Sequence, residues 1–165
     1  MLRVSKLTDY ATVVLSYMAS HDEPRLHTTA ELSAATGVAQ PTVSKILKLL
    51  TRASVLKSIQ GAKGGYSLST SPEKTTVASI ISAIEGPVSI TECSSETGHC
   101  DQESSCSIRW NWGRINQAIQ SALDSVTLAD MIAPESTSII NINVSSLYGG
   151  DSRLIRANKQ QNLES

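Results

Sequence analysis

The sequence contains no phenylalanine, and its other aromatic residues are two tryptophans and four tyrosines. The core must therefore be built from leucine, isoleucine, valine and alanine. No stretch approaches the roughly 18 consecutive apolar residues of a membrane-spanning helix, so we expect no membrane contact. Lys6 and Asp9 interrupt any apolar run near the start, which argues against a secretory signal.

Motifs that commonly carry enzyme chemistry are also absent, because the sequence has no P-loop, no GxGxxG and no paired carboxylates. A small enzyme with a nucleophilic cysteine is the remaining enzymatic alternative. It lacks a credible base, since His21 and His27 lie near the first turn and His99 lies among the cysteines. We therefore expect a protein that is not an enzyme and has no small-molecule substrate.

Cysteine is scarce, but all three cysteines, Cys93, Cys100 and Cys106, lie in one polar segment. We call residues 87–107 the cysteine loop. An odd number of thiols cannot all pair within one chain and, without an export signal, indicates the reducing cytoplasm. Thiolates are soft donors that suit zinc or iron–sulfur clusters. The spacing C-x6-C-x5-C lacks the C-x2-C pair of zinc ribbons.

Three cysteines are one ligand short of a tetrahedral site. His99 could complete a zinc site, but it is adjacent to Cys100, and neighbouring side chains rarely converge on one ion. A cluster would more readily take its fourth ligand from elsewhere, including a second subunit. The alternative of three ordinary thiols is unattractive, because free cysteine is usually buried and these lie among Ser, Glu, Asp and Gly.

A net charge of −1 gives no nucleic-acid signal for the chain as a whole, but the charges are unevenly distributed. No Lys or Arg occurs between Lys74 and Arg109, whereas residues 37–66 contain no acid. The five cations of that acid-free segment are Lys45, Lys48, Arg52, Lys57 and Lys63.

The spacing of apolar residues predicts a first amphipathic helix over about residues 5–20. Thr28-x-x-Glu31 is typical of a capping box that starts a second helix, and Gly37 would end it. Pro41 is suited to the first position of a third helix. A short helix, a Gly-containing turn and a second helix form the helix-turn-helix pattern.

Two β-prone runs, residues 55–59 and 66–68, flank a Gly-rich turn and predict a hairpin, the wing of a winged helix. Thr75 or Thr76 would cap a further helix that ends at Gly86. Beyond the cysteine loop, apolar residues alternate spacings of four and three, which indicates a helix that pairs with a second copy. These residues are Ile108, Trp112, Ile115, Ile119, Ala122 and Val126.

The predicted fold is mainly α, a winged helix-turn-helix DNA-binding domain with a long dimerisation helix. Its parts are residues 1–86 for DNA binding, the cysteine loop, residues 108–133 for the dimerisation helix and a short helix capped by Thr127-x-x-Asp130, and a polar tail over 134–165. Within the tail, Ile140, Ile142 and Val144 alternate as in a strand.

The second helix of a helix-turn-helix enters the major groove, with its N-terminal residues nearest the bases. Gln, Thr and Lys can contact base edges, and a Gly-rich wing tip can approach the backbone or minor groove. The alternative is that the helix pair and hairpin contact protein. The predicted DNA-binding residues are Gln40, Thr42, Ser44, Lys45, Lys48, Gln60 and Lys63.

Several segments together resemble the iron–sulfur-cluster regulators, a family of winged-helix transcription factors that includes IscR and NsrR. They are VSKLTDYATVVL, GVAQPTVSKILKLLTRA, GAKGGYSL, ISAIEGPVSITEC and VTLADM, and the similarity covers about residues 1–133. MLRVSKLTDYA, ITEC and RWNWGRIN are most similar to the sub-group that regulates the SUF iron–sulfur assembly operon.

The resemblance implies a cytoplasmic homodimer that binds promoter DNA of SUF-like iron–sulfur assembly genes. It also implies a [2Fe–2S] or [4Fe–4S] cluster held by Cys93, Cys100 and Cys106, with [2Fe–2S] favoured, whose presence or state changes DNA affinity. The alternative is a winged-helix repressor without a cluster that acts as a thiol redox or protein-partner sensor.

The chain departs from the family pattern in two places. IscR-like proteins have a His ligand three residues after the third cysteine, but this position is Arg109, which cannot bind iron. NsrR-like proteins use an Asp from the partner subunit's first helix, and the matching Asp9 is our candidate fourth ligand. Its alternative role is that of a solvated carboxylate in a first helical turn. Gln60 lies where relatives often have a wing Arg.

Overall fold

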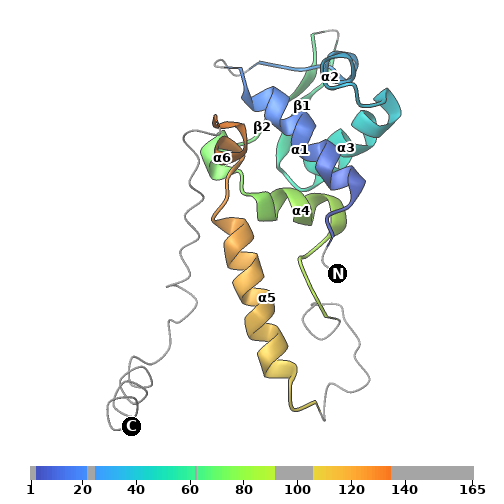
Figure 1. The fold of residues 1–165 in the computed structure, drawn as a ribbon. Coiled ribbons are helices and arrows are strands. Elements are labelled where there is room, and N and C mark those ends of the chain that lie inside the picture. Colours follow the sequence, from blue (N-terminus) through green and yellow to red (C-terminus); the bar gives the residue numbers. More distant parts are fainter. Residues whose placement is uncertain (1–2, 22–24, 62, 92–105, 135–165) are drawn as a thin grey trace.

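The computed structural model describes residues 3–21, 25–61, 63–91 and 106–134 (Figure 1). The predicted winged-helix fold is confirmed: the described residues are mainly helical, with one small antiparallel sheet. In chain order the elements are α1 (Lys6–Ala19), α2 (Thr29–Thr36), α3 (Gln40–Arg52), β1 (Leu56–Ile59), β2 (Gly65–Leu68), the 3-10 turn η1 (Pro72–Lys74), α4 (Val77–Glu85), α5 (Arg109–Asp124) and α6 (Leu128–Ile132).

The core is formed where α1 and α3 pack together with α2, α4 and α6. Its large apolar side chains are mostly aliphatic, since the chain has no phenylalanine, and they are almost completely buried. Burying a side chain of this size contributes about 1.5–3 kcal/mol to folding. The largest fully buried aliphatic side chains are Leu15, Leu32, Ile46, Leu47, Leu50, Leu56, Ile80 and Leu128.

The turn between α2 and α3 has the geometry that the sequence predicts. Thr28 and Glu31 form a reciprocal capping box at the start of α2. Gly37 ends the helix with φ +71°, a left-handed conformation that glycine adopts without steric cost. The third helix begins one residue earlier than predicted, at Gln40, because the carbonyl oxygen of Ala39 already accepts from the amides of Thr42 and Val43.

The wing hairpin pairs β1 with β2 in an antiparallel register, from Leu56 opposite Leu68 to Ile59 opposite Gly65. A further pairing was not predicted. The amide of His27 donates to the carbonyl of Tyr66 at 2.8 Å, and the Tyr66 amide donates back at 2.9 Å. The segment before α2 therefore adds a short edge to the wing and joins it to the helix-turn-helix.

Replacing Gly65 by alanine is expected to destabilise the protein by about 1–3 kcal/mol, the usual cost of overpacking. A Cβ at this position would lie 2.8 Å from the His27 carbonyl oxygen and 3.1 Å from the carbonyl carbon. The measurement is urea unfolding. Gly113→Ala is the matched control, because a Cβ in α5 meets nothing within 4 Å there and alanine favours a helix. Equal unfolding midpoints for the two variants would contradict the close approach at Gly65.

Helix α5 extends away from the α1–α4 body (Figure 1). The apolar seam of α5 has a covered half and an exposed half. Ile119 faces α4, whereas Ile108, Trp112 and Ile115 are 52%, 38% and 44% exposed. The seam is thus covered by the chain's own α4 near one end and uncovered near the other.

The short helix α6 closes the body against α1. The predicted Thr127–Asp130 capping box is present. The Val77 amide donates to the Val126 carbonyl and the Leu128 amide to the Thr75 carbonyl, so the starts of α4 and α6 are hydrogen-bonded together. Among the described residues, none of the helices has the length and apolar character to cross a bilayer. The strand predicted at residues 140–144 lies outside the described residues.

Candidate functional site

The outward face of α3 carries a row of cations. Lys45 and Lys48 are exposed and, with Arg52, line a shallow depression that also includes Pro41 and Ser44. Within the described residues, none of these three cations is ion-paired. Arg52 was not among the predicted contacts, although its spacing of four and seven from Lys48 and Lys45 places all three on one helical face.

The other predicted DNA-binding residues lie at the ends of the same elements. Gln40 is exposed at the first residue of α3, and Thr42 is half-buried in its first turn. Gln60 and Lys63 are exposed in the turn that joins β1 to β2. The structure therefore brings these residues onto solvent-facing parts of the helix-turn-helix and the wing, where a polyanion can reach them.

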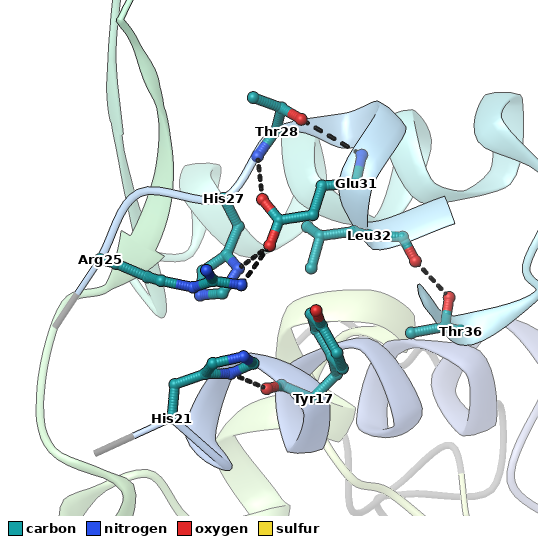
Figure 2. Close-up of polar contacts among 8 residues, drawn as sticks. All are labelled: Tyr17, His21, Arg25, His27, Thr28, Glu31, Leu32 and Thr36. Atoms are coloured by element: carbon teal, nitrogen blue, oxygen red, sulfur yellow. Dashed lines mark hydrogen bonds and ion pairs between the residues drawn. The ribbon is translucent and has the colours of Figure 1, made fainter. Parts of the chain in front are cut away.

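The carboxylate of Glu31 joins three parts of this domain (Figure 2). One oxygen accepts from Nδ1 of His27 at 3.0 Å and from the guanidinium of Arg25, and the other from the amide of Thr28. Burial acts to raise the pKa of Glu31, but the hydrogen bond and charge of His27, with Thr28 and Arg25, hold it below its ordinary value of 4.5.

This network positions α2 against the wing, because His27 is also paired with Tyr66. Sequence reasoning predicted the capping box of α2 but missed His27 and Arg25. The i, i+4 spacing of His27 and Glu31 was the available signal.

Of the three candidate cysteine ligands, Cys106 is described. It is a free, half-buried thiol that lies just before α5. Cys93 and Cys100 lie outside the described residues. The start of the cysteine loop is held against α5 by one side chain: Asn116 donates to the Val88 carbonyl at 3.2 Å and accepts from the Ile90 amide at 3.1 Å. Sequence reasoning did not identify Asn116, because nothing in the spacing marks it.

Asp9 lies exposed in the first turn of α1. A different carboxylate, that of Glu85, ties this turn to α4. Glu85, at the end of α4, accepts from the hydroxyl of Thr8 and from the amide of Ser5. The hydrogen bond from Thr8, with that from the Ser5 amide, lowers the pKa of Glu85 below 4.5. The beginning of α1 and the point where the chain enters the cysteine loop are therefore linked.

Within one chain, Asp9 and Cys106 are not brought together. The start of α1 lies beside the end of α4, whereas α5 starts at its far end, away from the α1–α4 body (Figure 1). In the parts of the chain that the structure describes, no group of three or more His, Cys, Asp or Glu side chains is arranged to hold a metal ion.

Comparison with known proteins identifies the family. A model of the Rrf2 family, described as iron-dependent transcriptional regulators, matches residues 4–134. A Rhodobacter capsulatus protein, described as an rrf2-like HTH-type transcriptional regulator, is 30% identical over 128 residues, which cover 74% of this chain and 85% of the relative.

Solved structures agree with that assignment. CymR of B. subtilis, described as its global cysteine regulator, is 28% identical with a TM-score of 0.61 and covers 80% of this chain and 97% of its own. IscR of T. potens is also 28% identical, with a TM-score of 0.56 over 83% of this chain and 92% of its own. With its helix-turn-helix, wing and extended α5, the chain belongs to the Rrf2 family of transcriptional regulators.

Proposed function

We propose that this Rrf2-family regulator is a cytoplasmic homodimer that binds the promoters of SUF-like iron–sulfur assembly genes according to the state of a bound iron–sulfur cluster. The observation that carries the proposal is the position of the cysteines. All three lie in the segment between α4 and α5, and Asn116 of α5 holds the start of that segment. A group bound there would contact the helix that joins the two copies.

The cations on α3 support DNA binding. Lys45, Lys48 and Arg52 lie on one face, where no described acid pairs with them, and Ser44 lies beside them. Phosphate contacts from such residues supply affinity, and contacts from the N-terminal part of the helix to base edges supply specificity. Gln60 and Lys63 extend the interface to the wing, where an uncharged Gln60 adds a hydrogen bond and no attraction to phosphate.

The exposed half of α5 supports a homodimer. Ile108, Trp112 and Ile115 present a continuous apolar strip to solvent, which a second copy of the same helix would cover. An operator with two half-sites one helical turn apart is bound by two recognition helices held in one assembly. A dimer through α5 supplies them.

The available donors fit an iron–sulfur cluster. Cys106 is a free thiol at the start of α5, and Cys93 and Cys100 supply two more thiolates. Asp9 is exposed and lies apart from Cys106 in its own chain, so as fourth ligand it would serve the cluster of the partner subunit. A bound cluster would supply redox chemistry, because its oxidation or loss would change the charge and the bonding at the loop.

Two contacts give a path from the loop to the DNA-binding residues. Asn116 ties the loop to α5, and Glu85 ties the end of α4 to Ser5 and Thr8 at the start of α1. Helix α1 packs directly on α3. A change in the loop can therefore alter the position of the two recognition helices. It acts as a switch if the two loop states then bind DNA with different affinity.

A second candidate function is thiol sensing without a cluster. It is favoured by the similarity to CymR, a cysteine regulator, and by the free, partly accessible thiol of Cys106. Visible absorption of protein purified without oxygen separates the two functions, because only a cluster produces sulfur-to-iron charge-transfer bands.

The test of the proposal is anaerobic cluster reconstitution followed by binding to a promoter fragment of an iron–sulfur assembly operon. We expect the cluster-loaded and cluster-free forms to differ about tenfold or more in affinity, within the usual range of allosteric coupling. Asp9→Ala is expected to lose its visible absorption faster than the unaltered protein. Equal DNA affinities would exclude the switch while leaving DNA binding intact.

A further inference from the structure

A cavity of about 360 Å³ lies between the C-terminal end of α1, the segment that precedes α2 and the base of the wing. It includes no residue of α3, so it is separate from the proposed DNA-binding face. Met18, Leu68 and Pro72 form an apolar part of its wall. Its volume is at the lower end of the range for small-molecule sites.

The rest of the wall is cationic or rich in donors. Lys57 and Arg25 contribute two formal positive charges, His21 and His27 contribute imidazoles, and none of the described residues that line the cavity is acidic. Ser69, Thr70 and Ser71 also line it. The Thr70 hydroxyl bonds to that of Thr75, and the Ser71 hydroxyl bonds to Glu73. The wall therefore combines cations and hydroxyls with an apolar surface.

The two imidazoles are held in place by their own contacts (Figure 2). Nδ1 of His21 donates to the Tyr17 carbonyl, and Nδ1 of His27 bonds to Glu31. The ring centroids of His21 and His27 are 5.3 Å apart, and Tyr17 packs edge-on against both. In neither ring does Nε2 have a hydrogen-bond partner among the described residues.

The described acidic side chains compensate the charge of this wall only in part. Glu31 bonds to Arg25 and His27 from outside the lining and offsets the charge of Arg25. Lys57 is exposed on β1 and is not ion-paired with any described residue. An ammonium that no described acid neutralises, beside two fixed imidazoles and an apolar patch, suits a ligand with a single anionic head and a compact apolar body.

We propose that this cavity binds a small organic anion, with its carboxylate or phosphate group at Lys57, Arg25 and the two imidazoles and its apolar body against Met18 and Leu68. Such a ligand would contact Arg25 and His27, the partners of the Glu31 carboxylate that caps α2. The site is thus one contact from the helix-turn-helix and distinct from the cysteine loop.

The test uses the full chain prepared without oxygen, with benzoate, inorganic phosphate and the uncharged benzamide as probes. The readout is the proton NMR shift of the His21 and His27 rings at constant ionic strength, with the Trp110 indole of α5 as internal reference. We expect a saturable shift with a dissociation constant of about 1 mM for at least one anion and none for benzamide. The anion that binds more tightly identifies the head group.

Lys57→Gln is expected to weaken this binding at least about fivefold, the loss of one charge-assisted contact. Lys74→Gln is the matched control, because Lys74 is exposed, lies nearby in η1 and does not line the cavity. The proposal is overturned if neither anion gives a saturable shift by about 20 mM, a value about twentyfold above the expected constant. It is also overturned if benzamide matches benzoate or if both lysine variants behave alike.

Discussion

Replacing Ile115 by glutamate is expected to prevent formation of the proposed dimer, so that the variant is a monomer, and to weaken operator binding about a hundredfold or more. Ile115 lies on the exposed half of the α5 seam, between Trp112 and Ile119. In a two-fold dimer each substitution occurs twice, so two carboxylates would be buried against apolar partners. Burying a charge without a partner costs several kcal/mol, and each 1.4 kcal/mol is about tenfold in affinity.

The measurement is sedimentation equilibrium, with operator affinity taken from fluorescence anisotropy. Gln117→Glu is the matched control, since it introduces the same charge in the same helix but on the opposite, exposed face. That variant should remain dimeric. If Ile115→Glu also remains dimeric at micromolar concentration, the α5 seam is not the dimer interface.

Replacing Lys45 by alanine is expected to cost about 1–3 kcal/mol for each half-site, and so to lower operator affinity by tenfold or more. Lys45 is exposed in the N-terminal half of α3, where a recognition helix approaches the bases, and none of the described acids pairs with it. Affinity for unrelated DNA should fall less, so the ratio of specific to non-specific binding should also fall.

The comparison with Lys48 distinguishes base contacts from phosphate contacts. Lys48→Ala should weaken binding to all sequences alike and reduce the salt dependence by about one ion for each subunit. Lys74→Ala, remote from α3 and equally exposed, should change neither quantity. If all three variants bind the operator as tightly as the unaltered protein does, α3 is not the recognition helix.

Local signals predicted most of the fold correctly. The Thr28 and Thr127 capping boxes, the left-handed Gly37 and the Gly-rich wing turn each specify their conformation within a few residues. The pairing of His27 with Tyr66 and the hydrogen bonds that join α4 to α6 could not be predicted, because they link residues far apart in the chain.

The candidate site was predictable to a similar degree. Charge and spacing indicated the α3 lysines, which are exposed, and their contact with DNA stays a prediction. The apolar periodicity of α5 predicted the seam, but not which half of it is covered by α4 and which half is exposed. That depends on how the two helices pack. Asn116 holds the start of the cysteine loop, and Glu85 holds the start of α1, through tertiary contacts that carry no sequence signature.

The most direct test of the central claim is the iron and acid-labile sulfide content of protein purified without oxygen, measured beside Cys106→Ala. The claim predicts a coloured protein with iron and sulfide in equal amounts, about two of each per subunit for a [2Fe–2S] cluster, and a colourless, iron-free variant. An unaltered protein that is colourless and free of metal, or a Cys106→Ala variant that keeps its iron, would contradict it.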